Sequence, residues 1–132
     1  MNLQVGVKIL LKNKEGKYLL VRRDAKKYPE VGAKWDIVGG RIDPGTTLIE
    51  NLKREVKEET GLLIDGEPTI IKVQDILRVE GLHVVRLTYT GEADGEVILS
   101  DEHDKYDWFT LDEMLELEPM DIYFKEILNE MK

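Results

Sequence analysis

The stretch 39–62 constrains the fold more than any other part of the chain, because it combines a glycine pair with a helix whose two ends are both marked. Thr47 and Glu50 have the spacing of a capping box, which satisfies free backbone N–H groups at a helix N-terminus. Gly61 has the position of the glycine that commonly ends a helix. Apolar residues recur every four positions between these ends: Leu48, Leu52 and Val56. The pattern predicts one amphipathic helix that follows Gly45.

The other segments are mostly rich in β-forming residues, and the chain ends in a second helical pattern. Residues 3–12 and 17–23 flank a turn signal at 13–16 (NKEG) and are predicted to form a β-hairpin. Further strands are expected over residues 35–38, 69–79, 83–90 and 106–109. A last helix is expected from about Asp121 to Met131, with apolar residues on one face: Phe124, Ile127, Leu128 and Met131. This order of elements indicates an α/β layered domain.

Composition restricts the class of protein. The chain has 132 residues, of which 42% are apolar, so residues 1–132 are expected to form a single domain with its own core. Acidic residues outnumber basic ones by 27 to 19, and the net charge of −8 predicts no stable nucleic-acid binding. The chain has no cysteine, so any metal must be held by oxygen or histidine. The sequence shows neither a signal peptide nor a membrane span, and the expected location is the cytoplasm.

Three glutamates share one face of the predicted helix near its C-terminal end. Glu55, Glu58 and Glu59 stand at positions i, i+3 and i+4, where Cβ atoms are about 5–6 Å apart. Like charges this close repel one another, raise one another's pKa values and are further disfavoured by the helix dipole. Mg²⁺ binds carboxylates together with water and phosphate oxygens. The cluster therefore predicts a magnesium site for a polyphosphate, with Mn²⁺ as an alternative ion.

A solvated helix face would explain the same glutamates without a metal. Basic residues of the helix have the spacing for ordinary ion pairs with them: Lys53, Arg54 and Lys57. Gly39 and Gly40 are compatible with a metal site, because a residue without Cβ lets a backbone carbonyl approach an ion closely. The glutamates alone leave the two interpretations open.

Residues 40–62, GRIDPGTTLIENLKREVKEETGL, resemble the Nudix box, G x(5) E x(7) R E U x E E x G U, in which U is a bulky aliphatic residue. Eight of the nine defined positions match: Gly40, Arg54, Glu55, Val56, Glu58, Glu59, Gly61 and Leu62. Outside the box, the resemblance continues through Trp35 before the glycine pair and Glu102-His103 followed by Tyr106 and Trp108. The whole chain thus looks like a MutT-like Nudix hydrolase.

The resemblance implies an α/β fold of the Nudix type, an α/β/α sandwich with a mixed central sheet. It also implies a set of metal ligands: the backbone carbonyl of Gly39 and the side chains of Glu55, Glu58 and Glu59. Arg54 would organise the loop and the helix by ion pairing rather than react. In related enzymes an acid from a later loop often joins the site as a ligand or general base, and Glu102 is the candidate here. A charged loop residue beside Asp101 and Asp104 is the alternative interpretation of Glu102.

Thr46 departs from the box, because the family has a glutamate there that supports the arginine and the catalytic glutamate. That ion pair is missing from this chain. Asp43 or Glu50 could take its place, or the site could turn over more slowly. The sequence leaves these outcomes open.

Several residues outside the box are candidates for substrate binding. Arg23 ends a strand and Arg41 follows the glycine pair, so both are candidates for phosphate contacts, with an exposed surface charge as the alternative for each. Tyr28 lies in a polar loop over residues 26–34 that could cover a site, and it is a candidate for stacking on a base. His83 and His103 lack the spacing of a zinc site and are expected to be structural or exposed.

Nudix enzymes act on a nucleoside diphosphate linked to another group, and some subclasses carry a marker residue downstream of the box. Leu77, Arg78 and Val79 occupy these places, so the markers of ADP-ribose and diadenosine polyphosphate enzymes are absent. By elimination, the expected reaction is cleavage of a nucleoside triphosphate, standard or oxidised, to monophosphate and pyrophosphate. The alternatives are hydrolysis of ADP-ribose, a nucleotide sugar or a dinucleoside polyphosphate, a non-catalytic nucleotide sensor, and an acidic interaction domain. A monomer and a homodimer are both compatible with the sequence.

Overall fold

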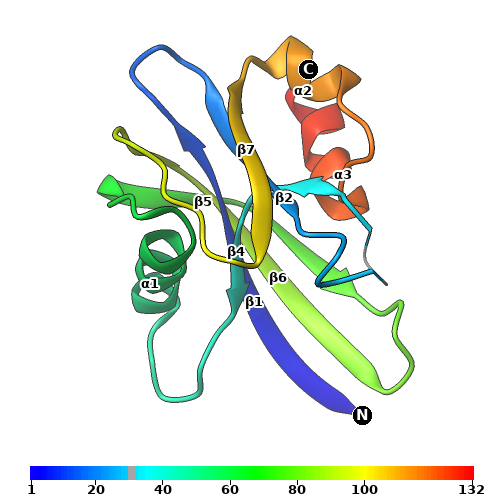
Figure 1. Ribbon diagram of the computed structural model, residues 1–132. Helices are drawn as coiled ribbons and strands as arrows, with labels where there is room; N and C mark the ends of the chain where they lie inside the picture. Colours follow the sequence, from blue (N-terminus) through cyan, green and yellow to red (C-terminus); the bar gives the residue numbers. More distant parts are fainter. Residues whose placement is uncertain (30–31) are drawn as a thin grey trace.

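The computed structural model describes residues 1–29 and 32–132 (Figure 1). The strands are β1 (Asn2–Lys12), β2 (Tyr18–Arg23), β3 (Trp35–Asp36), β4 (Val38–Arg41), β5 (Asp65–Ile76), β6 (Leu82–Glu92) and β7 (His103–Phe109). The helices are α1 (Leu48–Thr60), α2 (Leu111–Glu116) and α3 (Ile122–Met131). Residues 30 and 31 of the predicted loop at 26–34 lie outside the described residues. Within the described part of the chain, no helix is long and apolar enough to cross a membrane.

β1 lies at the centre of a mixed sheet. It pairs in parallel with β6 along its whole length, from Asn2 opposite Leu82 to Lys12 opposite Glu92. Its other edge pairs antiparallel with β4 over residues 6–9. β5 is the antiparallel neighbour of β6, and β2 pairs with both β3 and β7. The parallel pairing of β1 with β6 beside antiparallel pairs confirms the expectation of a mixed sheet.

The predicted hairpin between β1 and β2 is only partly correct. Its turn is present, because the backbone N–H of Asn13 donates to the carbonyl of Lys17 at 2.9 Å. Beyond the turn, Lys12 opposite Tyr18 is the one aligned pair of these strands in the described residues. β4 occupies the edge of β1 that a longer hairpin would need, so β2 diverges and pairs with β7 instead.

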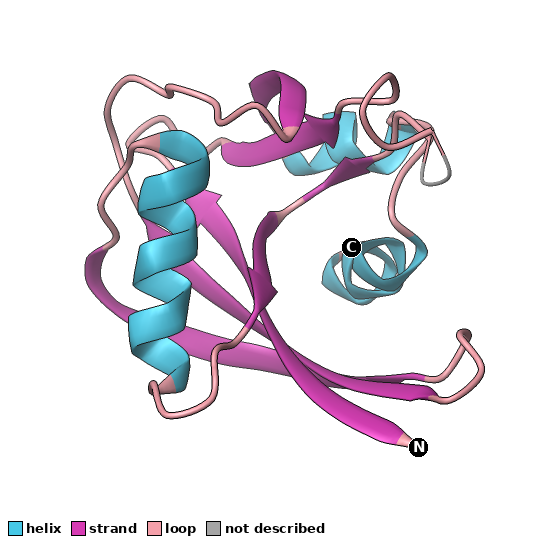
Figure 2. Ribbon diagram, turned by 60° about the horizontal axis from the view of Figure 1, so that its bottom comes forward, coloured by secondary structure: helices cyan, strands magenta, loops and turns pink. Residues whose placement is uncertain are grey.

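Helices cover both faces of the sheet, which gives the expected α/β/α sandwich (Figure 2). Successive residues of a strand point to opposite faces, and β1 and β2 supply both cores in this way. The core beneath α1 takes Val7, Ile9, Leu11, Leu19 and Val21 from the two strands. The core beneath α2 and α3 takes Leu10 and Leu20 from the same strands.

The ends of α1 agree with the sequence-based prediction, whereas α2 was missed. The hydroxyl of Thr47 accepts a hydrogen bond from the backbone N–H of Glu50 at 3.1 Å, and Gly61 follows the last turn with φ 74°. At the start of α2, Thr110 and Glu113 form a complete capping box. That signature is visible in the sequence, but a helix of six residues is too short for an apolar period to reveal it.

The loop between β6 and β7 joins the C-terminal end of α1 to the start of β7. The backbone N–H of Ile98 donates to the carbonyl of Thr60 at 2.9 Å, and that of Ser100 donates to the carbonyl of Glu59 at 3.2 Å. These bonds satisfy carbonyls that a helix end leaves free. They hold Glu102, the last residue before β7, close to the end of α1 that carries the glutamates.

Candidate functional site

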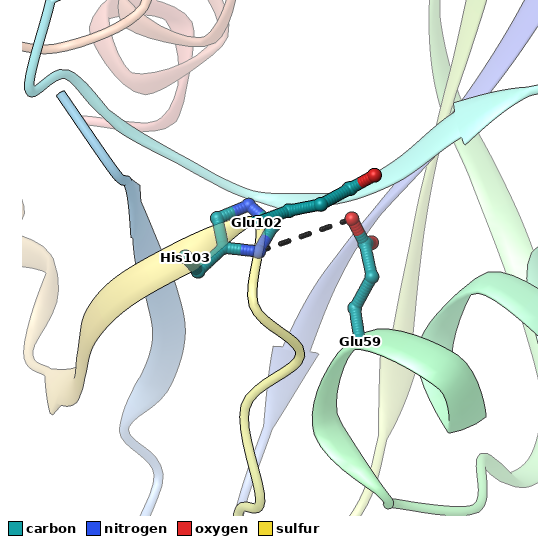
Figure 3. Close-up of side chains that lie close together, drawn as sticks. All are labelled: Glu59, Glu102 and His103. Atoms are coloured by element: carbon teal, nitrogen blue, oxygen red, sulfur yellow. Dashed lines mark ion pairs between the residues drawn. The ribbon is translucent and has the colours of Figure 1, made fainter. Parts of the chain in front are cut away.

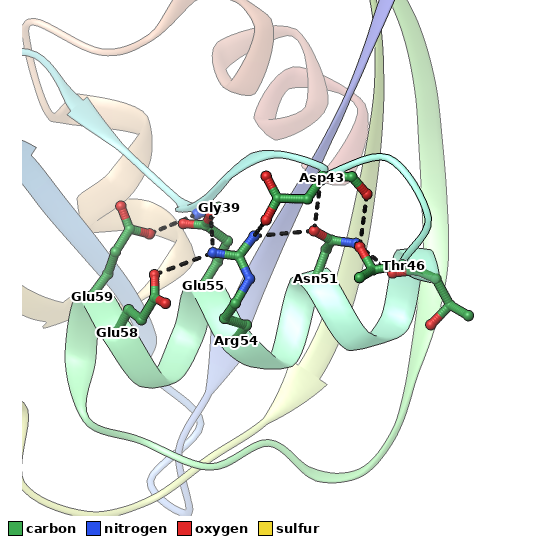
Figure 4. A network of polar contacts seen from close by, with 9 residues as sticks. Gly39, Asp43, Thr46, Asn51, Arg54, Glu55, Glu58 and Glu59 are labelled. Atoms are coloured by element: carbon green, nitrogen blue, oxygen red, sulfur yellow. Dashed lines mark hydrogen bonds and ion pairs between the residues drawn. The ribbon is translucent and has the colours of Figure 1, made fainter.

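The glycine pair of β4 lies directly against the glutamates of α1 (Figure 4). The backbone N–H of Gly39 donates a hydrogen bond to Oε2 of Glu59 at 3.2 Å. A Cβ atom on Gly40 would stand 2.9 Å from the carboxylate of Glu55, so this carboxylate packs against bare backbone. The absence of side chains at Gly39 and Gly40 therefore lets two carboxylates of α1 approach β4 closely.

Burial separates the three glutamates into two kinds. Glu59 is only 4% exposed, and its burial raises its pKa to about 8. Burial also raises the pKa of Glu55, against the attraction of Arg54. Glu58 differs, because its side chain is 59% exposed and pairs with Arg54 at 3.3 Å. The buried Glu59 and the partly buried Glu55 thus form the inner part of the cluster, and Glu58 forms its solvent edge.

Arg54 is held among three acids. Its guanidinium lies 3.2 Å from the carboxylate of Asp43, 3.4 Å from that of Glu55 and 3.3 Å from that of Glu58. Of the two residues expected to replace the missing box glutamate, Asp43 is therefore in place. Glu50 has no ion pair with Arg54 in the described part of the chain.

Asn51 completes the support of Arg54 and was not singled out from the sequence. Its side chain is 1% exposed, and its Oδ1 accepts hydrogen bonds from the backbone N–H of Asp43 at 2.9 Å and from Arg54 at 3.0 Å. Its amide donates to the hydroxyl of Thr46 and to the carbonyl of Thr47. The hydroxyl of Thr46 in turn donates to the carbonyl of Asp43 at 2.8 Å. Thr46 therefore supports Arg54 only indirectly, through Asn51. Hydrogen bonds of uncharged side chains take the place of the ion pair that the family has at this position.

Glu102 and His103 meet Glu59 at the start of β7 (Figure 3). One ligating atom of each of these three residues lies within 4.8 Å of the others. Nδ1 of His103 is 4.0 Å from Oε1 of Glu59, and both side chains are more than nine-tenths buried. Burial, together with the nearby Arg23, lowers the pKa of His103 to about 4, so its imidazole is neutral at neutral pH. Of the two histidines expected to be structural or exposed, His103 is therefore buried beside Glu59, whereas His83 pairs with Asp75 at 2.7 Å.

Glu55, Glu59 and Glu102 line a cleft of about 500 Å³. Arg23 and Arg41, the two cations expected to bind phosphate, both line it. Arg41 also donates a hydrogen bond to Gln4. Tyr28 does not line the cleft in the described part of the chain; its ring lies 4.9 Å from the guanidinium carbon of Arg23. Tyr28 thus contacts a cleft residue without reaching the cleft itself.

The cleft also contains an ion pair that sequence motifs did not indicate. Arg86 of β6 lies 3.0 Å from Oδ2 of Asp121, and the same oxygen accepts from the backbone N–H of Phe124 at 3.0 Å. Arg78 lines the cleft as well, and both arginines lie against the ring of Tyr123. Asp121 caps α3 and Arg86 lies in mid-strand, so no local pattern connects them.

The donor set of the site fits a divalent cation. Carboxylate oxygens are the ligands that hard divalent ions prefer, and two carboxylates, one buried and one partly buried, lie here against bare backbone. Burial raises the pKa values of both, and a nearby cation would favour their ionised forms. The nearby imidazole nitrogen of His103 has no hydrogen-bond partner in the described residues.

Fold and site together define a domain that places helix-borne acids beside a glycine pair in a cleft lined by arginines. The family model of the NUDIX domain matches residues 2–131. The chain therefore belongs to the Nudix family, and the segment 40–62 is its Nudix box. Solved structures support the same assignment. A MutT protein from Methanosarcina mazei Go1 superimposes on this chain with a TM-score of 0.84 at 30% identity, and the match covers 97% of this chain and 91% of that one.

Two curated relatives illustrate the range of the family. The nucleoside triphosphatase NudI of Salmonella agona (strain SL483) is 30% identical over 110 residues, which make up 76% of this chain and 77% of that protein. The 8-oxo-dGDP phosphatase NUDT18 of Homo sapiens is 34% identical over 80 residues, or 61% of this chain and 23% of that protein. The chain thus spans about a quarter of the length of the human relative.

The two glycines of β4 should respond differently to alanine. A Cβ on Gly39 would stand 2.0 Å from the carbonyl oxygen of Val7, at a φ of 154° that side-chain-bearing residues rarely adopt, so Gly39→Ala should lower the free energy of unfolding by more than about 3 kcal/mol. A Cβ on Gly40 meets the mobile end of Glu55, so Gly40→Ala should keep most of the stability and displace that carboxylate. Urea denaturation measures both, and equal stability of the two variants would contradict the packing described.

Asn51→Ala should lower the free energy of unfolding by about 1–3 kcal/mol, because it leaves buried partners in the loop and helix without hydrogen bonds. Asn129→Ala is the matched control, since Asn129 is an exposed asparagine in a helix and its loss should change stability by less than about 0.5 kcal/mol. Chemical denaturation of both variants in a metal-free buffer provides the comparison. Similar small effects would show that the Asn51 network contributes nothing to stability.

The pKa of Glu59 gives a pH-dependent prediction for the metal-free protein. Its folded pKa of about 8 lies above the ordinary value of 4.5. The contribution of Glu59 to the free energy of unfolding is therefore fully present below about pH 4.5 and is lost as the pH rises through 8. Glu59→Gln lacks this loss and should be more stable than the parent by about 2–4 kcal/mol at about pH 9, with the difference vanishing near pH 4. Comparing the two proteins cancels the contribution of His103, and urea denaturation in EDTA tests the slope. A difference independent of pH would contradict the buried state of Glu59.

Proposed function

We propose that residues 1–132 act as one Nudix domain that hydrolyses a phosphoanhydride bond of a nucleoside polyphosphate with Mg²⁺, for which Mn²⁺ can substitute. The preferred substrate is a nucleoside triphosphate, standard or oxidised, cleaved to monophosphate and pyrophosphate. The observation that carries the proposal is the buried carboxylate of Glu59 beside the partly buried carboxylate of Glu55, both packed against the glycine pair in an arginine-lined cleft. The printed names of NudI and of the MutT neighbour support nucleotides as the substrate class.

The metal ligands of the proposal are Gly39, through its carbonyl, and the three glutamates Glu55, Glu58 and Glu59. A divalent cation held there screens phosphate charge and lowers the pKa of a bound water. The residues of the chain have separate parts in this reaction. Glu55 and Glu59 define the position of the ion, and Arg54, tied to Asp43 and Asn51, lowers the repulsion among the acids of α1.

The cations of the cleft would bind the polyphosphate. Arg23 and Arg41 line it beside the acids, and a guanidinium suits phosphate because its donors match two oxygens at once. Tyr28 would support this indirectly, because its ring lies against Arg23 and restricts that side chain. Glu102 lies beside Glu59 and would serve as a further ligand or as the general base.

The pair Arg86 and Asp121 would bind the base of the nucleotide. One carboxylate oxygen of Asp121 is occupied by Arg86 and by the N-terminus of α3, which leaves the other oxygen as an acceptor in the cleft. Arg86 supplies donors beside it, so the two side chains together present both hydrogen-bonding functions that a base edge requires. This arrangement supports a nucleotide over inorganic polyphosphate.

A non-catalytic sensor is the less favoured function. Thr46, which replaces the usual glutamate of the box, is the feature that would favour loss of catalysis. Arg54 nevertheless keeps its contacts with three acids: Asp43, Glu55 and Glu58. The support that the family obtains from one ion pair is thus present in another form.

A panel of nucleoside triphosphates, ADP-ribose, nucleotide sugars and dinucleoside polyphosphates, assayed with Mg²⁺ for product identity, tests the proposal. At least one triphosphate should yield monophosphate and pyrophosphate, and Glu55→Gln should reduce kcat about 10²- to 10³-fold by removing charge from the metal site. Glu50→Gln, at an exposed position of the same helix, is the control and should retain activity within about twofold.

The outcomes separate the candidate functions. Nucleotide binding without turnover in either Mg²⁺ or Mn²⁺ would favour the sensor, and neither binding nor turnover would favour an interaction domain. Full activity of Glu55→Gln would remove Glu55 from the proposed machinery.

A further inference from the structure

His103 is a buried polar side chain, and one of its ring nitrogens lacks a hydrogen-bond partner among the described residues. Its side chain is 7% exposed, and its Nδ1 has no hydrogen-bond partner among the described residues. An unsatisfied buried nitrogen costs about 1–3 kcal/mol, so its presence calls for a partner that the protein chain does not supply. Figure 3 shows this nitrogen directed at the carboxylate of Glu59, with Glu102 beside it.

The gap between His103 and Glu59 has the size of an ion rather than of a hydrogen bond. Nδ1 of His103 and Oε1 of Glu59 are 4.0 Å apart, well beyond the reach of a hydrogen bond. An ion with ligand distances of about 2.0–2.2 Å on each side spans this gap. The other oxygen of Glu59 accepts from Gly39, which leaves Oε1 free on the side of the imidazole.

The backbone holds the three ligating groups in this arrangement. The carbonyl of Glu102 accepts from the backbone N–H of Asp24 at 3.0 Å, and His103 is paired with Arg23 of β2. The loop on the other side is bonded to the carbonyl of Glu59 through Ser100. Strand and helix thus fix the segment from both sides, and a site whose ligands are fixed in advance loses little entropy when an ion binds.

We propose that His103 is a metal ligand through Nδ1, which completes with Glu59 and Glu102 a mixed nitrogen and oxygen site for a first-row transition ion. The inference deepens the proposed function, because Glu59 belongs to the proposed magnesium site. Mg²⁺ prefers oxygen ligands, whereas imidazole favours transition ions. The presence of His103 therefore shifts the preference of the site from Mg²⁺ toward first-row transition ions, among which paramagnetic Mn²⁺ is the experimental probe.

Pulsed EPR of the full chain with Mn²⁺ alone, without nucleotide, tests the proposal. The parent protein should show the ¹⁴N coupling of a directly bound imidazole. The chain has two histidines, so the assignment is clean: His103→Gln should lose the coupling, and His83→Gln, the matched control, should keep it. His103→Gln should also weaken Mn²⁺ binding about tenfold or more, while Mg²⁺ affinity measured by competition changes less than about threefold.

Two results would overturn the proposal: no ¹⁴N coupling in the parent protein with Mn²⁺ bound, or a coupling that survives in His103→Gln. The first needs no variant, so it stands even if His103→Gln folds poorly. Failure of this inference is distinguishable from failure of the proposed function. Hydrolysis with Mg²⁺ but no nitrogen coupling defeats the histidine ligand alone, whereas nitrogen coupling without hydrolysis of any substrate defeats the hydrolase alone.

Discussion

The close approach of two carboxylates to the glycine pair of β4 is the contact on which the rest of the site depends. The backbone N–H of Gly39 donates a hydrogen bond to Glu59, and the carboxylate of Glu55 packs against the backbone of Gly40. Burial at this contact disfavours both charges, so in the metal-free protein the acids lie in an environment that a bound cation would make more favourable. The glycine pair, the position of α1 and the raised pKa values of the two acids are therefore aspects of a single packing arrangement.

The features of the fold that could be predicted from the sequence are those that depend on residues close together in the chain. The ends of α1, at Thr47 and Gly61, follow from capping chemistry within a few positions. Runs of β-forming residues and the turn signal at 13–16 likewise predicted most of the strands. The long hairpin was wrong because strand pairing is a competition among distant segments: β4 and β6 take the edges of β1, and no local signal ranks them against β2. α2 was missed because a helix of six residues shows no period.

The candidate site also has a part that neighbouring residues predict and a part that only the fold brings together. The acids and Arg54 lie in one continuous box, so their proximity was predictable and their burial was not. Asn51 carried a weak signal, a polar residue within the helix, but its partners lie in a loop whose path only the fold defines. Arg86, Asp121 and His103 come from three segments that meet only in the folded chain, and the spacing between them in the sequence contains no information about that meeting.

The two cores beneath the sheet allow the ends of the substrate site to diverge separately in evolution. The acids project from α1, which packs on one core, whereas Asp121 begins α3, which packs on the other. A substitution that tilts α3 can therefore reshape the Asp121 end of the cleft while the carboxylates of α1 keep their places. A scaffold of this kind can change one end of its cleft without rebuilding the other.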